Sequence, residues 1–304
     1  MSVIPVASFP SSVWDGVTPQ RASRKIEAAP DKDDWAEVLS EVISIETQLY
    51  PVAADSVIWV APHGKATATG SIINPYASIA LAYAAVTADD TVICVMPGTY
   101  THAAILAITG TYTGVKIIGV GGSAVTILDH TTADDAAITI IPAIATAFSV
   151  TIEGITILQY AAKIGIEIDD TGQSANAITV NLSDVKLTID TSGDSLDLVH
   201  AVAIGVILNL ENCVFTGLLD LDIINAADRL NADYCELTGG VTLTAGAVAA
   251  IASFRYCVLK DGSDMTSAAE QTINALYCTS TTIGLVATGD LSGGTATEVV
   301  LPAS

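Results

Sequence analysis

The chain has few charged, few basic and few aromatic residues. Only 14% of its 304 residues are charged, 11 are Lys or Arg against 33 Asp or Glu, and 5% are aromatic. The formal net charge of −22 argues against attraction to nucleic acid or to an anionic membrane. We therefore expect neither as a partner, and the scarcity of basic groups disfavours enzymes that act on acidic polysaccharides.

Long apolar runs and a secretory signal are also missing. The apolar run from Ala201 to Leu208 is far shorter than a membrane span. The first residues, Met1 to Pro5, contain neither a basic segment nor an apolar core. These features predict synthesis in a cytoplasm without export.

The chain does contain an internal repeat. Cys213, Cys235, Cys257 and Cys278 are separated by 22, 22 and 21 residues (235−213, 257−235, 278−257). Each cysteine lies in a strand-like phrase, such as Leu-Glu-Asn-Cys-Val-Phe. A fixed period of this length indicates a solenoid.

The same phrase recurs upstream with a β-branched residue in place of cysteine. Ile155 and Val185 occupy the equivalent positions, and the spacing lengthens there to 30 and 28 residues (185−155, 213−185). Loops can bulge from a stack of strands without disturbing it. We therefore expect the additional residues in turns at 169–173 and 190–194.

The cysteines are interpreted as reduced structural thiols. On successive rungs they would lie about 4.8 Å apart, with parallel Cβ directions that suit a disulfide poorly. A ladder also lacks the converging ligands of a metal site. Cys94, in an apolar run, is interpreted as a small buried hydrophobic residue. We expect no cofactor and no bound metal.

Short runs rich in Val, Ile and Thr, separated by Gly, Asp and Asn turns, predict β-strands after residue 57. With the repeat, they predict an all-β fold, a right-handed parallel β-helix over residues 57–304. A jelly roll or other sandwich is the alternative. The predicted strands include 91–95, 115–120, 125–128, 137–141, 149–152, 164–168, 177–182 and 206–210.

A short helix is predicted from Tyr76 to Val86, with Asn74 as its N-cap and Pro75 in its first turn. A stacked core leaves its first rung open to water. We expect this helix to cap that end.

Residues 1–56 are predicted to form a separate attachment and trimerisation segment. Four prolines punctuate residues 1–30, which indicates an extended arm. A helix is predicted from about Asp33 to Leu49, and its apolar residues Trp35, Val38, Val42, Ile45 and Leu49 have the 3-4 spacing of a coiled-coil seam. This seam either docks on the solenoid or pairs three copies in a homotrimer. Trp14 and Trp35 are candidate attachment contacts, because buried aromatics dominate many interfaces.

Several segments between Ile58 and Leu128 are similar to known proteins. They are Ile58–Gly64, Gly70–Ile79, Met96–Tyr100 and Val115–Gly122. This stretch resembles the opening of pectin-lyase-like β-helix proteins, especially virion proteins of tailed bacteriophages. The segment Ser12–Pro19 also resembles N-terminal attachment segments of phage structural proteins. The resemblance implies the fold and leaves the activity open, because the superfamily includes lyases, hydrolases, adhesins and structural fibres.

Candidate catalytic groups are sparse. A glycoside hydrolase needs two carboxylates about 5 to 10 Å apart. The sequence offers Asp134 with Asp135, Asp169 with Asp170, and Asp220 with Asp222. Acidic pairs in turns are usually solvated turn formers, so we expect the chain not to be an enzyme.

Metal ligands are equally sparse. Each histidine is expected at the surface or in a turn, since the four lie in different segments: His63, His102, His130 and His200. An inserted loop with Asp190, Asp194 and Asp197 could offer oxygen ligands to calcium. It lacks the glycine-pinned spacing of a dedicated calcium loop.

Together these observations predict a virion structural protein. We expect a homotrimeric β-helix, made in the host cytoplasm and placed on the outer surface of a particle. Residues 1–56 would attach it to the major capsid protein or another shell protein, as a capsid decoration (cement) or a short head fibre. The alternative is a tail or capsid spike that binds or cleaves host surface glycans.

Tyr234, Tyr256 and Tyr277 are the candidate glycan platform for that alternative. Each directly precedes a repeat cysteine. Their rings are therefore expected to stack on the face opposite the thiols. A structural stack or a trimer contact is the other interpretation of the three tyrosines.

Overall fold

The computed structural model describes residues 57–109, 112–131, 136–141, 147–159, 163–169, 177–189, 193–199, 205–223, 225–245, 250–259 and 272–280. The predicted arm, seam and attachment contacts fall in residues 1–56, outside these ranges. They are Trp14, Trp35, Val38, Val42, Ile45 and Leu49, and their roles stay predictions.

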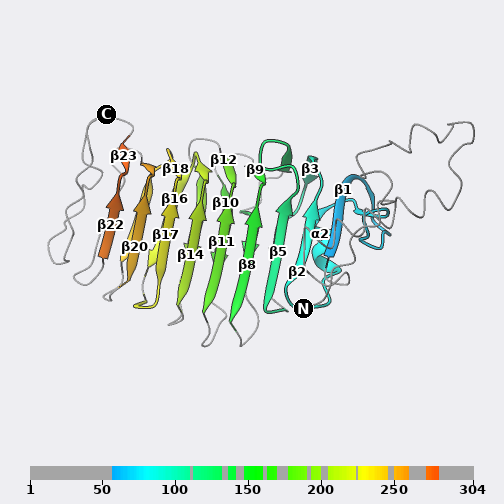
Figure 1. Cartoon of the computed structure of the whole chain (residues 1–304), viewed down its shortest axis with the longest axis horizontal. Helices are drawn as coiled ribbons and strands as arrows, with labels where there is room; N and C mark the ends of the chain where they lie inside the picture. The colour runs from blue at the N-terminus through cyan, green and yellow to red at the C-terminus, as the bar shows by residue number, and fades with distance from the viewer. Residues whose placement is uncertain are drawn as a thin grey trace, which may run out of the picture. The chain divides into compact units, whose positions relative to one another are not determined.

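The described strands form three parallel sheets (Figure 1). The first sheet contains, in order, β1 (Val57–Lys65), β2 (Thr91–Val95), β5 (Gly114–Gly119), β8 (Phe148–Glu153), β11 (Ile178–Ser183), β14 (Val206–Glu211), β17 (Arg229–Asp233), β20 (Ile251–Arg255) and β22 (Thr272–Leu276). The second contains β3 (Gly98–His102), β6 (Thr126–His130), β9 (Thr156–Gln159), β12 (Lys186–Ile189), β15 (Val214–Phe215), β18 (Glu236–Leu237), β21 (Val258–Leu259) and β23 (Thr279–Ser280). The third contains β4 (Leu106–Ile108), β7 (Ala136–Ile140), β10 (Ile164–Asp169), β13 (Asp194–Val199), β16 (Leu218–Ile223) and β19 (Val241–Ala245).

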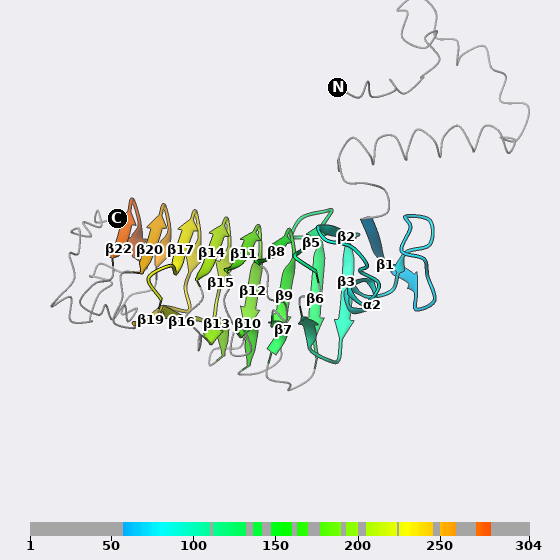
Figure 2. The ribbon, with the colours of Figure 1, turned by 90° about the horizontal axis from the view of Figure 1, so that it is seen from below.

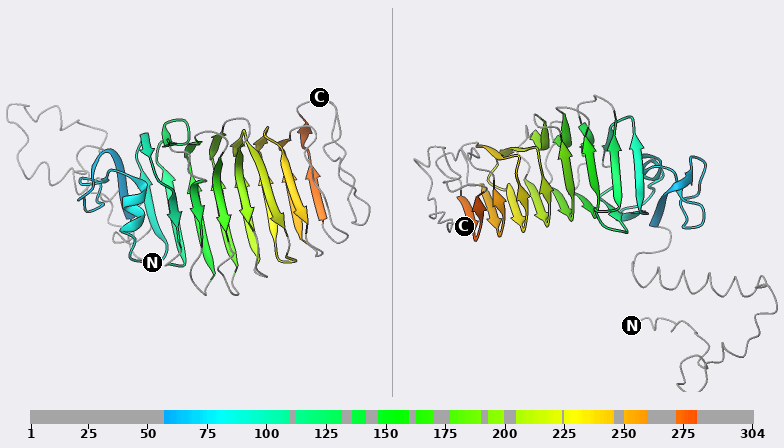
Figure 3. Two further views of the ribbon diagram at one scale, coloured as in Figure 1. Left: turned by 180° about the vertical axis from the view of Figure 1, so that it is seen from behind. Right: turned by 90° about the horizontal axis from the view of Figure 1, so that it is seen from above.

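In the regular part of the solenoid, each turn of the chain adds one strand to each sheet. β8 is followed by β9 in the second sheet and β10 in the third before β11 returns to pair with β8. The strands of the first sheet lie side by side in chain order (Figures 2 and 3). Crossovers between parallel strands are right-handed, so the fold is a right-handed parallel β-helix, as predicted. Pairings among the described strands are parallel, which excludes the jelly roll.

The repeat phrases stack in register, as the spacing predicts. Neighbouring residues on β9, β12, β15, β18, β21 and β23 pair directly. Ile155, Val185 and the four repeat cysteines are consequently buried in one column. The eight predicted strands of the sequence pattern all correspond to observed strands, with ends within a residue or two.

The predicted positions of the additional residues need correction. Asp169 ends β10 and Asp194 begins β13, so neither lies in a loop. Part of the longer spacing is absorbed by the second sheet, because β9 and β12 have four residues each and β15 and β18 have two. Residues 170–176 and 190–192 lie outside the described ranges.

The core is built from columns of inward side chains. Burial alternates along β8 and β11, which is the period of a strand with one face inside. Leu210, Ala232 and Phe254 follow one another in register across β14, β17 and β20. All three are buried, and the small Ala232 below Phe254 lets the largest side chain fit without a void.

An outer column of the first sheet is held by amide side chains. Asn209 Nδ2 donates to Asn181 Oδ1 at 2.8 Å, and Asn231 Nδ2 donates to Asn209 Oδ1 at 2.9 Å. Each amide both donates and accepts, so equal spacing on successive strands satisfies the column. The sequence pattern did not single out these asparagines.

The helix α2 (Ile79–Ala84) lies at the N-terminal end of the solenoid (Figure 1). Ile79, Ala82 and the following Val86 join the hydrophobic core, which fits the predicted capping role. The predicted N-cap is wrong, because the cap is Ser78, whose hydroxyl accepts a hydrogen bond from the Leu81 amide at 3.3 Å. Asn74 lies in a turn that bonds back to Ser71 and Gly70.

Candidate functional site

The corner between the first and second sheets has one residue in the left-handed conformation on each of six rungs. We call these residues the corner column: Gly154, Asp184, Asn212, Tyr234, Tyr256 and Tyr277, with φ of 66°, 49°, 53°, 56°, 55° and 57°. A left-handed residue lets the chain leave one sheet and enter the next within a single position. Glycine, asparagine and aspartate tolerate this conformation, whereas bulky side chains rarely adopt it.

The first corners are covered by the turn at residues 120–125. A Cβ on Gly154 would lie 2.7 Å from the Gly119 carbonyl oxygen and 3.2 Å from Gly122 Cα. The Asp184 carboxylate accepts from the Ser123 amide at 3.0 Å and from its hydroxyl at 2.8 Å. Glycine and aspartate therefore have local structural reasons to be there.

The last corners are open and carry three tyrosines, which we call the tyrosine ladder. Ring centroids are 5.0 Å apart between Tyr234 and Tyr256 and 5.1 Å apart between Tyr256 and Tyr277, with interplanar angles of 4° and 8°. The three residues are 59%, 49% and 69% exposed. The predicted stacking on the face opposite the thiols is confirmed, while the glycan role stays a prediction.

Fold stability does not explain three tyrosines at these corners. A left-handed backbone costs an ordinary residue about 1–2 kcal/mol. An aromatic pair contributes about 0.5–1.5 kcal/mol beyond its buried area. Three strained corners against two stacked pairs leave no clear gain from the rings. Backbone strain of this kind is often kept at functional surfaces.

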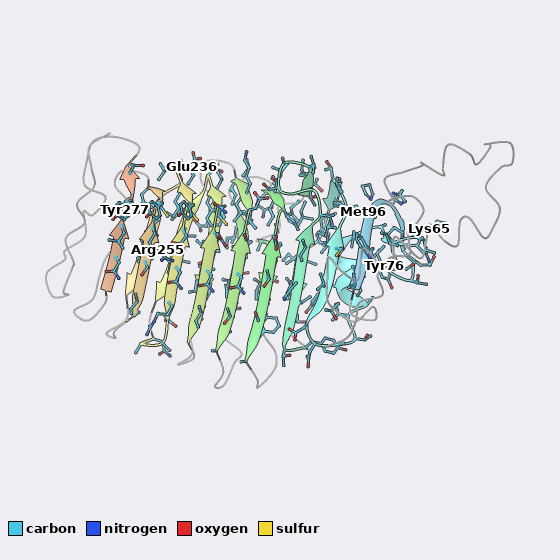
Figure 4. The ribbon with its side chains drawn as sticks, viewed as in Figure 1. Lys65, Tyr76, Met96, Glu236, Arg255 and Tyr277 are labelled. Carbon is cyan, nitrogen blue, oxygen red and sulfur yellow. The ribbon has the colours of Figure 1, made fainter. Side chains whose placement is uncertain are left out.

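Charged and apolar side chains border the ladder. Asp233, Arg255 and Leu276 precede the three tyrosines and pair in register. Arg255 Nε donates to Asp233 Oδ1 at 2.6 Å, and this hydrogen bond is the main cause of a raised pKa of Arg255. Leu276 is 53% exposed. Figure 4 shows Tyr277, Arg255 and Glu236 on neighbouring rungs near the carboxyl ends of the last strands of the first sheet.

The four repeat cysteines form a buried thiol column behind the ladder. All are free and at most 2% exposed, as is Cys94. Shared hydrogen bonds with the preceding thiol, followed by other effects including burial, raise the pKa of Cys235 to about 12 and that of Cys257 to about 11. Cys257 Sγ donates to the Ala232 carbonyl at 3.3 Å. Thiols with raised pKa values are poor nucleophiles, so this column is structural.

A row of carboxylates crosses the outer face of the third sheet, and sequence reasoning did not assemble it. Glu167 pairs with Asp197 and Asp197 with Asp220 on adjacent strands. Burial, then the charges of Asp220, Asp194, Glu167 and Asp222, raise the pKa of Asp197 to about 6. Burial also raises the pKa values of Asp194 and Asp220. The row could exchange protons near neutral pH.

The earlier acidic candidates are placed differently from expectation. Asp194 and Asp197 both lie on β13 rather than in an inserted loop, and Asp220 and Asp222 lie on β16 rather than in a turn. The carboxylate row was detectable as a 30-residue interval between Glu167 and Asp197, equal to the interval between Ile155 and Val185. Asp134, Asp135, Asp170 and Asp190 lie outside the described residues.

The histidine prediction is wrong for two of the four. His102 and His130 pair in register on β3 and β6, are 9% and 1% exposed, and have ring centroids 6.3 Å apart. His130 Nδ1 lies 2.7 Å from Gln159 Oε1. Burial, followed by the neighbouring His130, lowers the pKa of His102. His63 is exposed as expected, and His200 lies outside the described residues.

Two searches of the described ranges bear on other classes of site. They contain no group of three or more His, Cys, Asp or Glu side chains arranged to hold a metal ion. The same ranges include no helix with the length and apolar character needed to cross a membrane.

Known proteins are similar to this chain only in fold. No protein-family model and no curated protein matches the sequence. A solved rhamnogalacturonan lyase is 13% identical over 74% of each chain, with a TM-score of 0.43. A pectin methylesterase from carrot is 10% identical over 79% of this chain and 88% of its own, with a TM-score of 0.41. The deglycosylated pectin methylesterase from Aspergillus niger is 12% identical over 83% and 93%, with a TM-score of 0.40. At these values they support no inference about activity.

Proposed function

We propose that the chain is a virion structural protein, a homotrimeric parallel β-helix that decorates the outside of a capsid or forms a short head fibre. Residues 1–56 are the proposed anchor to the major capsid protein or another shell protein. The resemblance of the stretch from Ile58 to Leu128 to phage virion β-helices supports the setting.

The observation that carries this proposal is the construction of the solenoid. Buried apolar residues, thiols and outward amides continue in register from rung to rung. Solenoids of this kind are stabilised by contacts between neighbouring repeats. Such a rod can hold a surface away from its point of attachment, which is what a decoration or fibre protein must do.

Two measurements test the structural role. Light scattering of the purified full chain should give three times the protomer mass of 31.1 kDa. Residues 1–56 should resist protease on particles and be cleaved in the free protein. A monomer that is absent from purified particles would overturn the proposal.

Glycan cleavage is the second candidate function, and the raised pKa of Asp197 favours it. An acid that titrates near pH 6 beside further carboxylates can protonate a leaving group. The test is release of reducing ends from host polysaccharide by the purified chain, with Asp197→Asn as the matched variant. Turnover by the wild type that is lost in the variant would establish an enzyme. Equal reducing ends with and without protein would exclude cleavage of that polysaccharide.

A further inference from the structure

The tyrosine ladder exposes ring edges, hydroxyls and parts of ring faces. Aromatic carbons in contact lie about 3.5–4.0 Å apart. Parallel rings with centroids 5.0 Å apart must therefore be offset, so each ring covers only part of the next. Tyr256, the middle ring, is the least exposed at 49%. Within the described part of the chain no hydrogen bond involves the three phenol hydroxyls, which leaves them free to bond a ligand.

The ladder is also held in place before any ligand arrives. Each ring is positioned by a left-handed backbone residue, by its stacked neighbour and by a column of buried thiols directly behind it. A rigid aromatic side chain loses little conformational entropy on binding. Its regular spacing of 5.0 and 5.1 Å suits a ligand that is itself a linear repeat.

The size of the ladder favours a small contact over a protein interface. Aromatic side chains bury about 150–250 Å² each when fully covered. Exposures of 59%, 49% and 69% therefore leave an area on the order of 350 Å². A stable protein interface takes about 800 Å² from each partner. A second copy of the chain would have to bury much more than the ladder.

Charge narrows the ligand further. The net charge of −22 repels polyanions and second copies alike. Beside the ladder, Arg255 is already paired with Asp233, while Glu236 and Glu211 are exposed. Exposed carboxylates accept hydrogen bonds from sugar hydroxyls but disfavour acidic sugars. The surface therefore fits an uncharged polymer that has both C–H and hydroxyl groups.

We propose that the tyrosine ladder binds a neutral linear polysaccharide that lies along the solenoid axis. The C–H faces of successive sugars contact the rings of Tyr234, Tyr256 and Tyr277, and sugar hydroxyls bond the phenols and Glu236. The ladder has this role whether or not the chain is part of a particle.

The test is affinity electrophoresis and calorimetry of the full chain with linear mannan and cellohexaose, with polygalacturonate as the anionic comparison. We expect binding to at least one neutral probe and none to polygalacturonate. Tyr256→Asn should weaken binding about tenfold, and the triple change of all three tyrosines to asparagine should abolish it. Asparagine tolerates the left-handed corner, so these variants should fold.

Two further variants separate binding from general effects. Asn212→Tyr adds a fourth ring at the next rung and should strengthen binding several-fold, because it lengthens the ladder. Ile73→Ala, at a 75% exposed position in a different turn, should leave binding unchanged.

Three results would overturn the proposal. One is no binding to either neutral probe. Another is unchanged binding in the folded triple variant. The third is a fall in mass from oligomer to monomer in the triple variant, which would identify the ladder as a contact between copies.

Discussion

The corner column differs between its first and last rungs although its backbone does not. Gly154 and Asp184 lie against the turn at 120–125, whereas Tyr234, Tyr256 and Tyr277 are open to solvent. The φ values of all these residues lie between 49° and 66°. What covers the corner therefore decides which residue fits it. Where nothing covers it, the fold accepts a strained aromatic residue that adds little stability.

The strongest way to break this comparison is to place a tyrosine in the covered half. Gly154→Tyr should reduce the free energy of unfolding by about 2–4 kcal/mol, because its Cβ would collide with the Gly119 carbonyl. Chemical denaturation measures the loss. Asn212→Tyr is the control, with the same conformation and a ring beside it, and should change stability by less than about 1 kcal/mol. Equal losses in the two variants would contradict the role of the covering turn.

Removing the bonds between a corner and its covering turn should have a smaller effect. Asp184→Ala deletes the hydrogen bonds to the Ser123 amide and hydroxyl. We expect a loss of about 1–2 kcal/mol in denaturant unfolding. Asp184→Asn retains one acceptor and should lose about half as much. An unchanged midpoint in both variants would show that the turn packs without this anchor.

A column in which neighbours repel sharpens the comparison with stacked rings. Asp197 has a folded pKa raised from 3.8 to about 6, so folding takes up a proton between these values. Its contribution to stability is therefore greatest below pH 4 and falls as the pH rises to about 6. Asp197→Asn should make the protein about 1 kcal/mol more stable than wild type at pH 7 and close to it at pH 4. Melting curves at both pH values measure this. A variant that is less stable at pH 7 would mean that the carboxylate has a favourable partner.

The smallest effect is expected in the middle of the ladder. Tyr256→Asn loses two ring contacts and relieves one strained corner, so the free energy of unfolding should change by less than about 0.5 kcal/mol. Thermal and denaturant unfolding measure it. A loss above about 2 kcal/mol would show that the ladder exists to stabilise the rungs, and the argument for a binding surface would fail.

The sequence predicted the fold well where one phrase repeats at a constant interval. The cysteines at 22, 22 and 21 residues align the second sheet, and the tyrosines before them stack as expected. The N-cap of α2 was misplaced because Asn74 and Ser78 are both good caps. Only the backbone turn that uses Asn74 distinguishes them.

Prediction failed where neighbours come from rungs of different length. His102 with His130, and Glu167 with Asp197 and Asp220, meet only after the loops between strands set the register. The interval from Glu167 to Asp197 is 30 residues and that from Asp197 to Asp220 is 23. No single period joins them, so the sequence did not reveal that these side chains interact.

The sequence by itself determined the rung length, the inward thiol column and the outward tyrosines, because period two along a strand and a constant repeat require nothing from distant residues. Only the tertiary structure decided that the tyrosines take a left-handed backbone, that the turn at 120–125 covers the earlier corners, and that carboxylates raise one another's pKa. Those properties depend on which rungs lie against each other. Local sequence does not encode that contact.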